Sequence, residues 1–261
     1  MRRRVLIAIA ACFYYSGLVA CARWMTRRSG SRLVVLNYHR ATGGDLRRHL
    51  LYLRRHYRMM HAEEALEALY APFTRNYQWR DKRIPLVLTF DDGYRDNYTY
   101  GYALARELQI PFTIYLIPGY LDSGAYFWWL EGKRLVKRAC VDTVTFDGRT
   151  FRLDNVEDRL ALARFIDTKA RYASSVEERE QFLAAARTAL AVPCEQTDAE
   201  GPVLPLTWDE VREMDASGLV SFGAHTMHHP ILAYLADRGE VQCEVIDCRT
   251  LLLRSTWLAK V

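Results

Sequence analysis

Residues 85–97 read Pro-Leu-Val-Leu-Thr-Phe-Asp-Asp-Gly-Tyr-Arg-Asp-Asn, an apolar run followed by two acids and a glycine. The apolar run Leu86–Phe90 is typical of a strand that is buried on both faces, and it stops at Asp91 and Asp92. In parallel α/β proteins the carboxyl ends of the strands meet at one edge of the sheet, so acids there are candidates for catalysis. Gly93 can take a positive φ and turn the chain into a helix at residues 96–108. An ordinary Asp-Asp-Gly surface turn is the competing interpretation.

Strand and helix patterns alternate along the chain, which predicts parallel βα units and an α/β fold. The predicted strands are residues 33–38, 86–90, 111–117 and 219–224, and the predicted helices around them are residues 46–57, 63–69, 96–108, 208–217 and 240–253. Residues 75–83 are polar and are predicted to be a loop. The alternation fails between about residues 120 and 205, which we interpret as a mostly helical insertion. Within it, Asp147-Gly148 predicts a hairpin, and residues 156–169 and 176–190 predict two helices.

The composition argues against a nucleic-acid-binding protein and against a zinc site built from cysteines. Half of the 261 residues are apolar, which is enough for one sizeable hydrophobic core. The formal net charge is +5, but six arginines precede residue 30 and no acid accompanies them. The rest of the chain is therefore close to neutral, so no nucleic-acid partner is expected. The six cysteines contain no CxxC pair, which argues against a cysteine zinc site, although Cys243 and Cys248 could form a disulfide.

The N-terminus carries a charge-free run, residues 5–22, which these arginines flank. Its length matches a short transmembrane helix or a long signal-peptide core. We expect residues 1–30 to be an uncleaved signal anchor, because positive charge after an apolar run hinders export of that flank. The rest of the chain would then lie outside the cytoplasm, anchored to the membrane of the cell envelope. Two alternatives remain open: secretion after cleavage within Ala20-Cys21-Ala22, and a lipoprotein acylated at Cys21 in the lipobox-like Leu18–Cys21.

A second polar cluster follows the last predicted strand and reads His225-Thr226-Met227-His228-His229-Pro230. His225 and His229 are four residues apart, a separation that places two imidazoles on one face of a helical turn. Pro230 disfavours helical geometry at His229, so we expect this turn to be short. Two histidines and one carboxylate make a three-ligand set for a catalytic zinc-like ion, with the fourth position left to water. Of two adjacent aspartates, one can bind the ion while the other acts as general base.

The segments Thr89-Phe90-Asp91-Asp92-Gly93 and His225-Thr226-x-x-His229-Pro230 resemble the first two motifs of the polysaccharide deacetylase family, the NodB-homology carbohydrate esterases. The segment Asn37-Tyr38-His39-Arg40 is similar to the first-strand sequence of some members. The resemblance covers about residues 33–253. It implies a distorted (β/α) barrel of the NodB-homology type within a catalytic domain at residues 31–261.

The resemblance also implies an activity and a set of site residues. The activity is metal-dependent removal of N-acetyl groups, or sometimes O-acetyl groups, from polysaccharides of the N-acetylglucosamine type. Carried over by motif, Asp91 is the general base, while Asp92, His225 and His229 bind one divalent metal ion, usually Zn²⁺.

Only 32 residues follow His229, and they contain no counterpart of the family's arginine motif, further aspartate or late general-acid histidine. We therefore expect the barrel to lack its last strands. The leading hypothesis is a deacetylase of envelope or extracellular polysaccharide, and the alternative is a catalytically incompetent glycan-binding or structural remnant of such an enzyme. Two further sets of residues each have two possible roles. His39 is either a site residue or a structural partner, and Tyr126–Trp129 is either a sugar-stacking cluster or a packing cluster.

Overall fold

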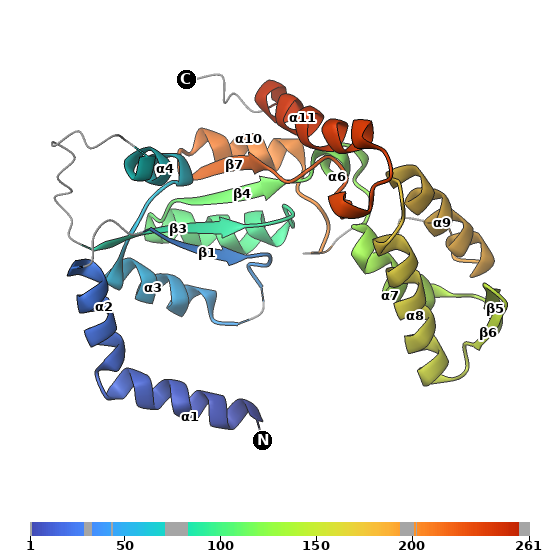
Figure 1. The fold of residues 1–261 in the computed structure, drawn as a ribbon, viewed down its shortest axis with the longest axis horizontal. Helices are drawn as coiled ribbons and strands as arrows, with labels where there is room; N and C mark the ends of the chain where they lie inside the picture. The colour runs from blue at the N-terminus through green and yellow to red at the C-terminus, as the bar shows by residue number, and fades with distance from the viewer. Residues whose placement is uncertain are drawn as a thin grey trace.

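The computed structural model describes residues 2–28, 33–42, 44–70, 83–193, 201 and 203–255. The predicted loop at residues 75–83, apart from Arg83, lies outside the described residues, and so does Cys194. A parallel sheet occupies the centre of the molecule, and a mostly helical lobe lies at one end of it (Figure 1).

The sheet confirms the predicted α/β fold. It consists of β1 (Val34–Tyr38), β2 (Tyr57–Met59), β3 (Ile84–Phe90), β4 (Phe112–Leu116) and β7 (Val220–Ala224), in the order β1-β3-β4-β7, with β2 paired to the start of β3. All pairings are parallel, and the register aligns Tyr38 with Phe90 and Leu116 with Ala224. The carboxyl ends of the strands therefore meet at one edge. The predicted barrel is not seen, because the described strands form an open sheet in which β1 and β7 do not pair.

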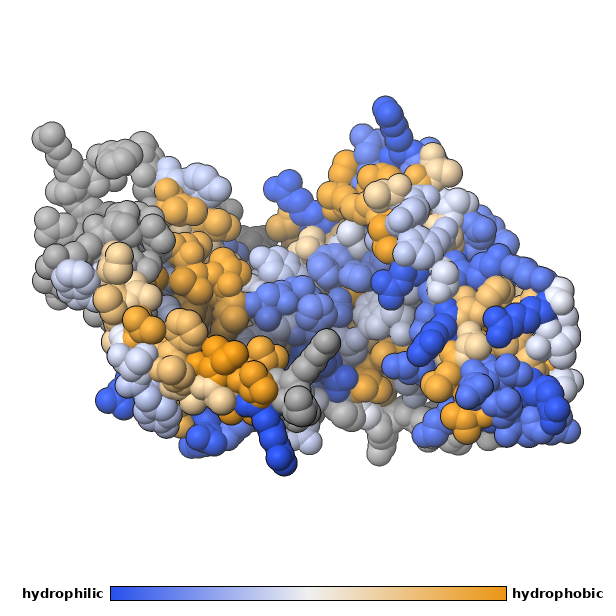
Figure 2. All heavy atoms as spheres, turned by 60° about the horizontal axis from the view of Figure 1, so that its bottom comes forward, coloured by the Kyte–Doolittle hydropathy of each residue, from blue (hydrophilic) through white to orange (hydrophobic). Residues whose placement is uncertain are grey.

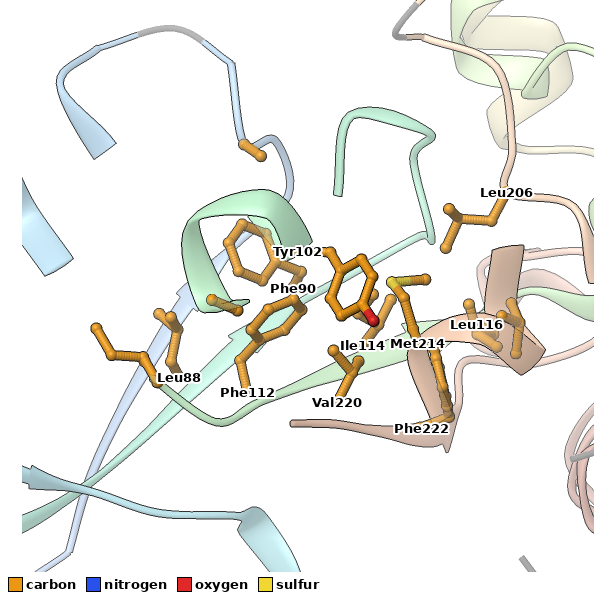
Figure 3. Close-up of a cluster of buried hydrophobic side chains, with 14 of the residues drawn as sticks. Leu88, Phe90, Tyr102, Phe112, Ile114, Leu116, Leu206, Met214, Val220 and Phe222 are labelled. Carbon is orange, nitrogen blue, oxygen red and sulfur yellow. The ribbon is translucent and has the colours of Figure 1, made fainter. Parts of the chain in front are cut away.

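The main hydrophobic core lies against one face of the sheet. Alternate residues of β3 contribute Leu86, Leu88 and Phe90 to this core, while Val87 packs against Met60 on the other face. The side chains labelled in Figure 3 come from the strands, from two helical segments over them and from the residues just before the second of these segments: Leu88, Phe90, Tyr102, Phe112, Ile114, Leu116, Leu206, Met214, Val220 and Phe222. Each fully buried Phe or Leu contributes about 1.5–3 kcal/mol, so this cluster holds the ends of β3, β4 and β7 in register.

The helices near the sheet are α3 (Leu46–His56), α4 (Ala62–Tyr70), α5 (Ala103–Leu108), α10 (Trp208–Ala216) and α11 (Arg238–Ser255), with a short 3-10 turn η2 (Leu232–Tyr234) before α11. One prediction is wrong in detail: residues 97–102 form a π-helical turn, η1 (Asn97–Tyr102), and only α5 continues as an α-helix. The turn follows the buried Asp96, whose carboxylate accepts hydrogen bonds from Arg40 Nε at 2.7 Å and from the backbone N–H of Thr42 at 3.1 Å. Because these contacts join residues far apart in the sequence, the spacing of apolar residues does not predict the π-helical turn.

The insertion lies between β4 and its sheet neighbour β7 and has its own hydrophobic cluster. It contains α6 (Pro118–Ser123), α7 (Trp128–Arg138), β5 (Thr143–Phe146), β6 (Arg149–Arg152), α8 (Val156–Arg171) and α9 (Val176–Ala189). The predicted hairpin is confirmed: β5 and β6 are antiparallel, and Asp147 and Gly148 both have positive φ, at 48° and 75°. The two predicted helices are α8 and α9.

The N-terminal run does not form one long helix. Residues Ser16 and Gly17 separate α1 (Arg2–Tyr15) from α2 (Leu18–Arg28), and Gly17 has a φ of +79°. Apolar side chains of α1 such as Leu6 and Ile7 are exposed, and Figure 2 shows apolar residues gathered over this helix. Among the described residues no helix has the length and apolar character needed to cross a membrane. The pairing considered for Cys243 and Cys248 is not formed, since both are free thiols on α11, one exposed and one buried.

Candidate metal centre

Asp92 occupies the tight turn that follows β3. Asp92 and Gly93 both adopt left-handed backbone conformations, with φ of 72° and 68°. A Cβ at Gly93 would lie 2.8 Å from Leu116 Cδ2, and this close approach together with the positive φ favours glycine at this position. The Asp92 side chain is 5 % exposed. The turn therefore buries this carboxylate at the edge of the sheet where the carboxyl ends of β4 and β7 also lie.

The two histidines follow β7, but not on a helical turn as predicted. Residues 225–231 are irregular, and Thr226 and His229 have left-handed φ values of 64° and 55°. Such values cost about 1–3 kcal/mol each in a residue other than glycine. The backbone N–H of His229 donates to Thr226 Oγ1 at 3.0 Å, which closes the loop. The loop, and not a helical face, thus brings the imidazole rings to a centroid separation of 4.9 Å.

Asp92, His225 and His229 converge on one point. Asp92 Oδ1 lies 3.5 Å from His225 Nε2 and 3.7 Å from His229 Nε2, and one ligand atom from each residue lies within 4.8 Å of the others. Ligands about 2.1 Å from a tetrahedral ion are about 3.4 Å apart, so this spacing fits a metal such as Zn²⁺. Asp92 Oδ1 is buried and has no hydrogen-bond partner among the described residues, as expected of an atom that binds a metal ion.

The protonation of His229 suits a metal ligand. Burial is the largest influence on its pKa, and the neighbouring His225 acts in the same direction, while Asp92 opposes them. The net effect lowers the pKa of His229 below its ordinary value. The ring is therefore neutral at neutral pH, which leaves a nitrogen lone pair available for coordination.

Asp91 diverges from Asp92, as the sequence predicted. Its side chain is 18 % exposed, and its Oδ2 lies 3.9 Å from His39 Nε2. His39 is itself 59 % exposed, so it lies at the rim and is not a buried structural partner. Asp91 is therefore the carboxylate of the pair that a substrate can reach.

The loop that carries the histidines is supported by α11, which the sequence analysis did not connect to the site. Glu244 is buried, and its carboxylate accepts hydrogen bonds from the backbone N–H of His228 at 2.9 Å and from His228 Nδ1 at 2.7 Å. Gly119 lies under the same loop, where an added Cβ would be 2.5 Å from the carbonyl oxygen of Met227. Because Gly119 and Glu244 lie outside the histidine motif in the sequence, no local pattern predicts their contacts with this loop.

The aromatic segment of the insertion also reaches the site. Phe127 and Trp128 are buried, whereas Trp129 is half-buried, and its ring centroid lies 4.8 Å from that of His229. Trp128 Nε1 donates to the carbonyl oxygen of His229 at 3.0 Å. Phe127 and Trp128 are therefore packing residues, and part of the packing of this segment is against a candidate ligand.

A family model described as polysaccharide deacetylase matches residues 80–256. The chain belongs to the polysaccharide deacetylase family. The match includes Asp91, Asp92, His225 and His229, and this is a family of hydrolases that are generally metal-dependent. A comparison with curated protein sequences finds no match.

Solved structures of polysaccharide deacetylases are also similar to this deacetylase chain. IcaB from Ammonifex degensii is 19 % identical with a TM-score of 0.48, over 87 % of this chain and 70 % of that one. The deacetylase PplD from Streptococcus pyogenes, in complex with acetate, is 17 % identical with a TM-score of 0.46, over 85 % and 68 %. A de-N-acetylase from Aggregatibacter actinomycetemcomitans is 18 % identical with a TM-score of 0.37, over 75 % and 55 %. The deacetylase chain thus spans between 55 % and 70 % of the length of these three.

Proposed function

We propose that this chain is a metal-dependent hydrolase that removes N-acetyl, or O-acetyl, groups from a cell-envelope or extracellular polysaccharide. The observation that carries the proposal is the convergence of Asp92, His225 and His229 within 4.8 Å, beside the accessible Asp91, in a chain of this family. In this proposal the first three residues bind one Zn²⁺ ion and Asp91 is the general base.

When bound, a divalent ion supplies a lowered pKa for water and polarisation of the acyl carbonyl. Asp91 accepts a proton from water as the water oxygen adds to the acetyl carbon. As the carbon–nitrogen bond breaks, Asp91 returns this proton to the amine nitrogen of the sugar, and acetate leaves. The buried Asp92 faces the two imidazoles and is not available for this exchange. One carboxylate of the pair would thus bind the ion, and the other would act as the general base.

Acetate release from N-acetylglucosamine oligomers by the Zn²⁺-loaded chain tests this proposal. We expect the wild type to release acetate, and Asp91→Asn to keep the metal while losing at least about 100-fold in turnover. Asp209→Asn is the control, because its side chain is 92 % exposed on α10 and lies outside the site. Retained turnover in Asp91→Asn would show that the base is elsewhere. A wild type that binds Zn²⁺ but releases no acetate from N-acetylated or O-acetylated glycans would favour the glycan-binding remnant.

For the location, we propose that residues 1–30 attach the deacetylase domain to the membrane from the outer side. The support is the charge-free run between two arginine groups and the exposed apolar side chains of α1. Fractionation of cells that make the full chain tests this. We expect the protein in the membrane fraction after a high-salt wash, and its release by that wash would contradict the proposal.

A further inference from the structure

Trp129 belongs to the insertion, yet it is closely packed against a candidate metal ligand. Its ring is 4.8 Å from that of His229 and is stacked on Phe127, with centroids 4.7 Å apart and an interplanar angle of 14°. Its Nε1 donates to the hydroxyl of Tyr94 at 2.7 Å. Tyr120 and Trp128 complete the set of ring neighbours, at 6.1 Å and 5.5 Å. With one ring face stacked on Phe127 and five aromatic neighbours in all, Trp129 is held by packing although it is half-buried.

His229 needs such support. A histidine that binds a metal through one nitrogen is normally oriented by a hydrogen bond from its other nitrogen to a protein acceptor. The Nδ1 atom of His229 is buried, and no described residue hydrogen-bonds it. The backbone of His229 is also held in the left-handed region, with a φ of 55°. The orientation of this ring therefore depends on packing and on the backbone contacts of its loop.

The insertion supplies both kinds of support through consecutive residues. Trp128 fixes the His229 backbone with its indole N–H, and Trp129 fixes the imidazole with its ring. The hydrogen bond from Trp129 to Tyr94 ties the indole to the residue that follows Gly93 in the turn of Asp92. The two halves of the ligand set, one after β3 and one after β7, thus share a contact with the same tryptophan.

We propose that Trp129 is a positioning residue for His229, which makes the insertion a structural part of the metal centre. This inference rests on the proposed function, because it takes His229 to be a metal ligand. In this role Trp129 acts through the His229 ring and is not itself a metal ligand. It restricts the imidazole to the orientation in which Nε2 faces Asp92, so that less freedom is lost when a metal binds.

The test compares Zn²⁺ affinity with the stability of the metal-free chain. The full chain is purified as wild type, Trp129→Ala, Trp129→Leu and Trp129→Phe, and the dissociation constant is measured by competition with a chromogenic chelator. Loss of an outer-shell partner of a ligating histidine typically weakens metal binding about 10- to 100-fold, and we expect this for the Ala and Leu variants. Trp129→Phe keeps a ring against His229 and is expected to lose less than about tenfold.

Trp208→Ala is the matched control. Trp208 is also half-buried and also donates an indole hydrogen bond, at 2.7 Å to Asp122 Oδ1, but has no ring contact with a candidate ligand in the described chain. We expect its Zn²⁺ affinity to equal that of the wild type. If Trp129→Leu melts at a lower temperature without metal but binds Zn²⁺ as tightly as the wild type, Trp129 is only a packing residue and the proposal is overturned. If the wild type itself binds no Zn²⁺, the proposed function fails first.

Discussion

Glu244 gives the sharpest prediction about how the histidine loop is held. Its carboxylate is 3 % exposed and accepts two hydrogen bonds from His228, one from the backbone and one from the ring. Truncation to alanine removes both acceptors and leaves the backbone donor buried. A hydrogen bond to a charged group contributes about 1.5–3 kcal/mol, and the 44 % exposure of His228 weakens the bond to its ring, so we expect the loss of both bonds to cost about 3 kcal/mol.

The assay is urea unfolding of the metal-free chain, with the midpoint and the slope measured for the wild type, Glu244→Ala and Glu244→Gln. The glutamine keeps the shape and one acceptor oxygen, so we expect it to lose about 1 kcal/mol. Asp247→Ala, at an exposed carboxylate on the same helix, is the control for helix propensity. A loss below about 0.5 kcal/mol in Glu244→Ala would refute the argument that this carboxylate holds the loop.

We also expect the stability that the Glu244 carboxylate contributes to depend on pH. Burial by itself would raise the pKa of Glu244, but the hydrogen bonds from His228 outweigh it and lower the pKa below the ordinary 4.5. The folded chain therefore binds fewer protons there than the unfolded chain. The stabilisation is present above pH 4.5 and is lost as the pH falls through the lowered value. The difference in stability between wild type and Glu244→Gln is expected to shrink over that range, and a constant difference would contradict this assignment.

The remaining predictions concern three other positions, Gly119, Asp96 and Cys248. Gly119→Ala is expected to lower the melting temperature and weaken Zn²⁺ binding, because its Cβ would overlap the carbonyl oxygen of Met227 at 2.5 Å; unchanged metal affinity would show that the loop can shift freely. Asp96→Ala is expected to cost about 3 kcal/mol in urea unfolding, since the fully buried carboxylate pairs with Arg40, and a neutral effect would count against this pairing. Burial raises the pKa of Cys248 to about 11, so iodoacetamide is expected to modify the exposed Cys243 and spare Cys248 in the folded chain, as peptide mass spectrometry can check.

The sequence predicted the parts of the site that lie within one motif. Two carboxylates could be placed at the end of a strand because an apolar run precedes Asp91 and a glycine follows Asp92. A histidine could be placed at the end of another strand because an apolar run precedes His225. The convergence of the three candidate ligands follows from the strand order, in which β4 alone separates β3 from β7.

Other features depend on contacts between distant segments, which no local pattern reports. The predicted helical turn at His225–His229 is replaced by a loop with left-handed residues, since Trp128 and Glu244 hold the loop from outside. The π-helical turn η1 follows from the burial of Asp96 against Arg40. The helix expected at residues 5–22 is broken at Ser16 and Gly17, a pair of residues with poor helix propensity within an apolar run.

The most direct test of the account is the metal content of the purified chain by mass spectrometry. We predict about one Zn²⁺ per chain in the wild type and in the control Asp209→Ala, and none in Asp92→Ala or His225→Ala. Metal content that is unchanged in both ligand variants, or absent from the wild type after incubation with Zn²⁺, would contradict the claim that Asp92, His225 and His229 form one metal centre.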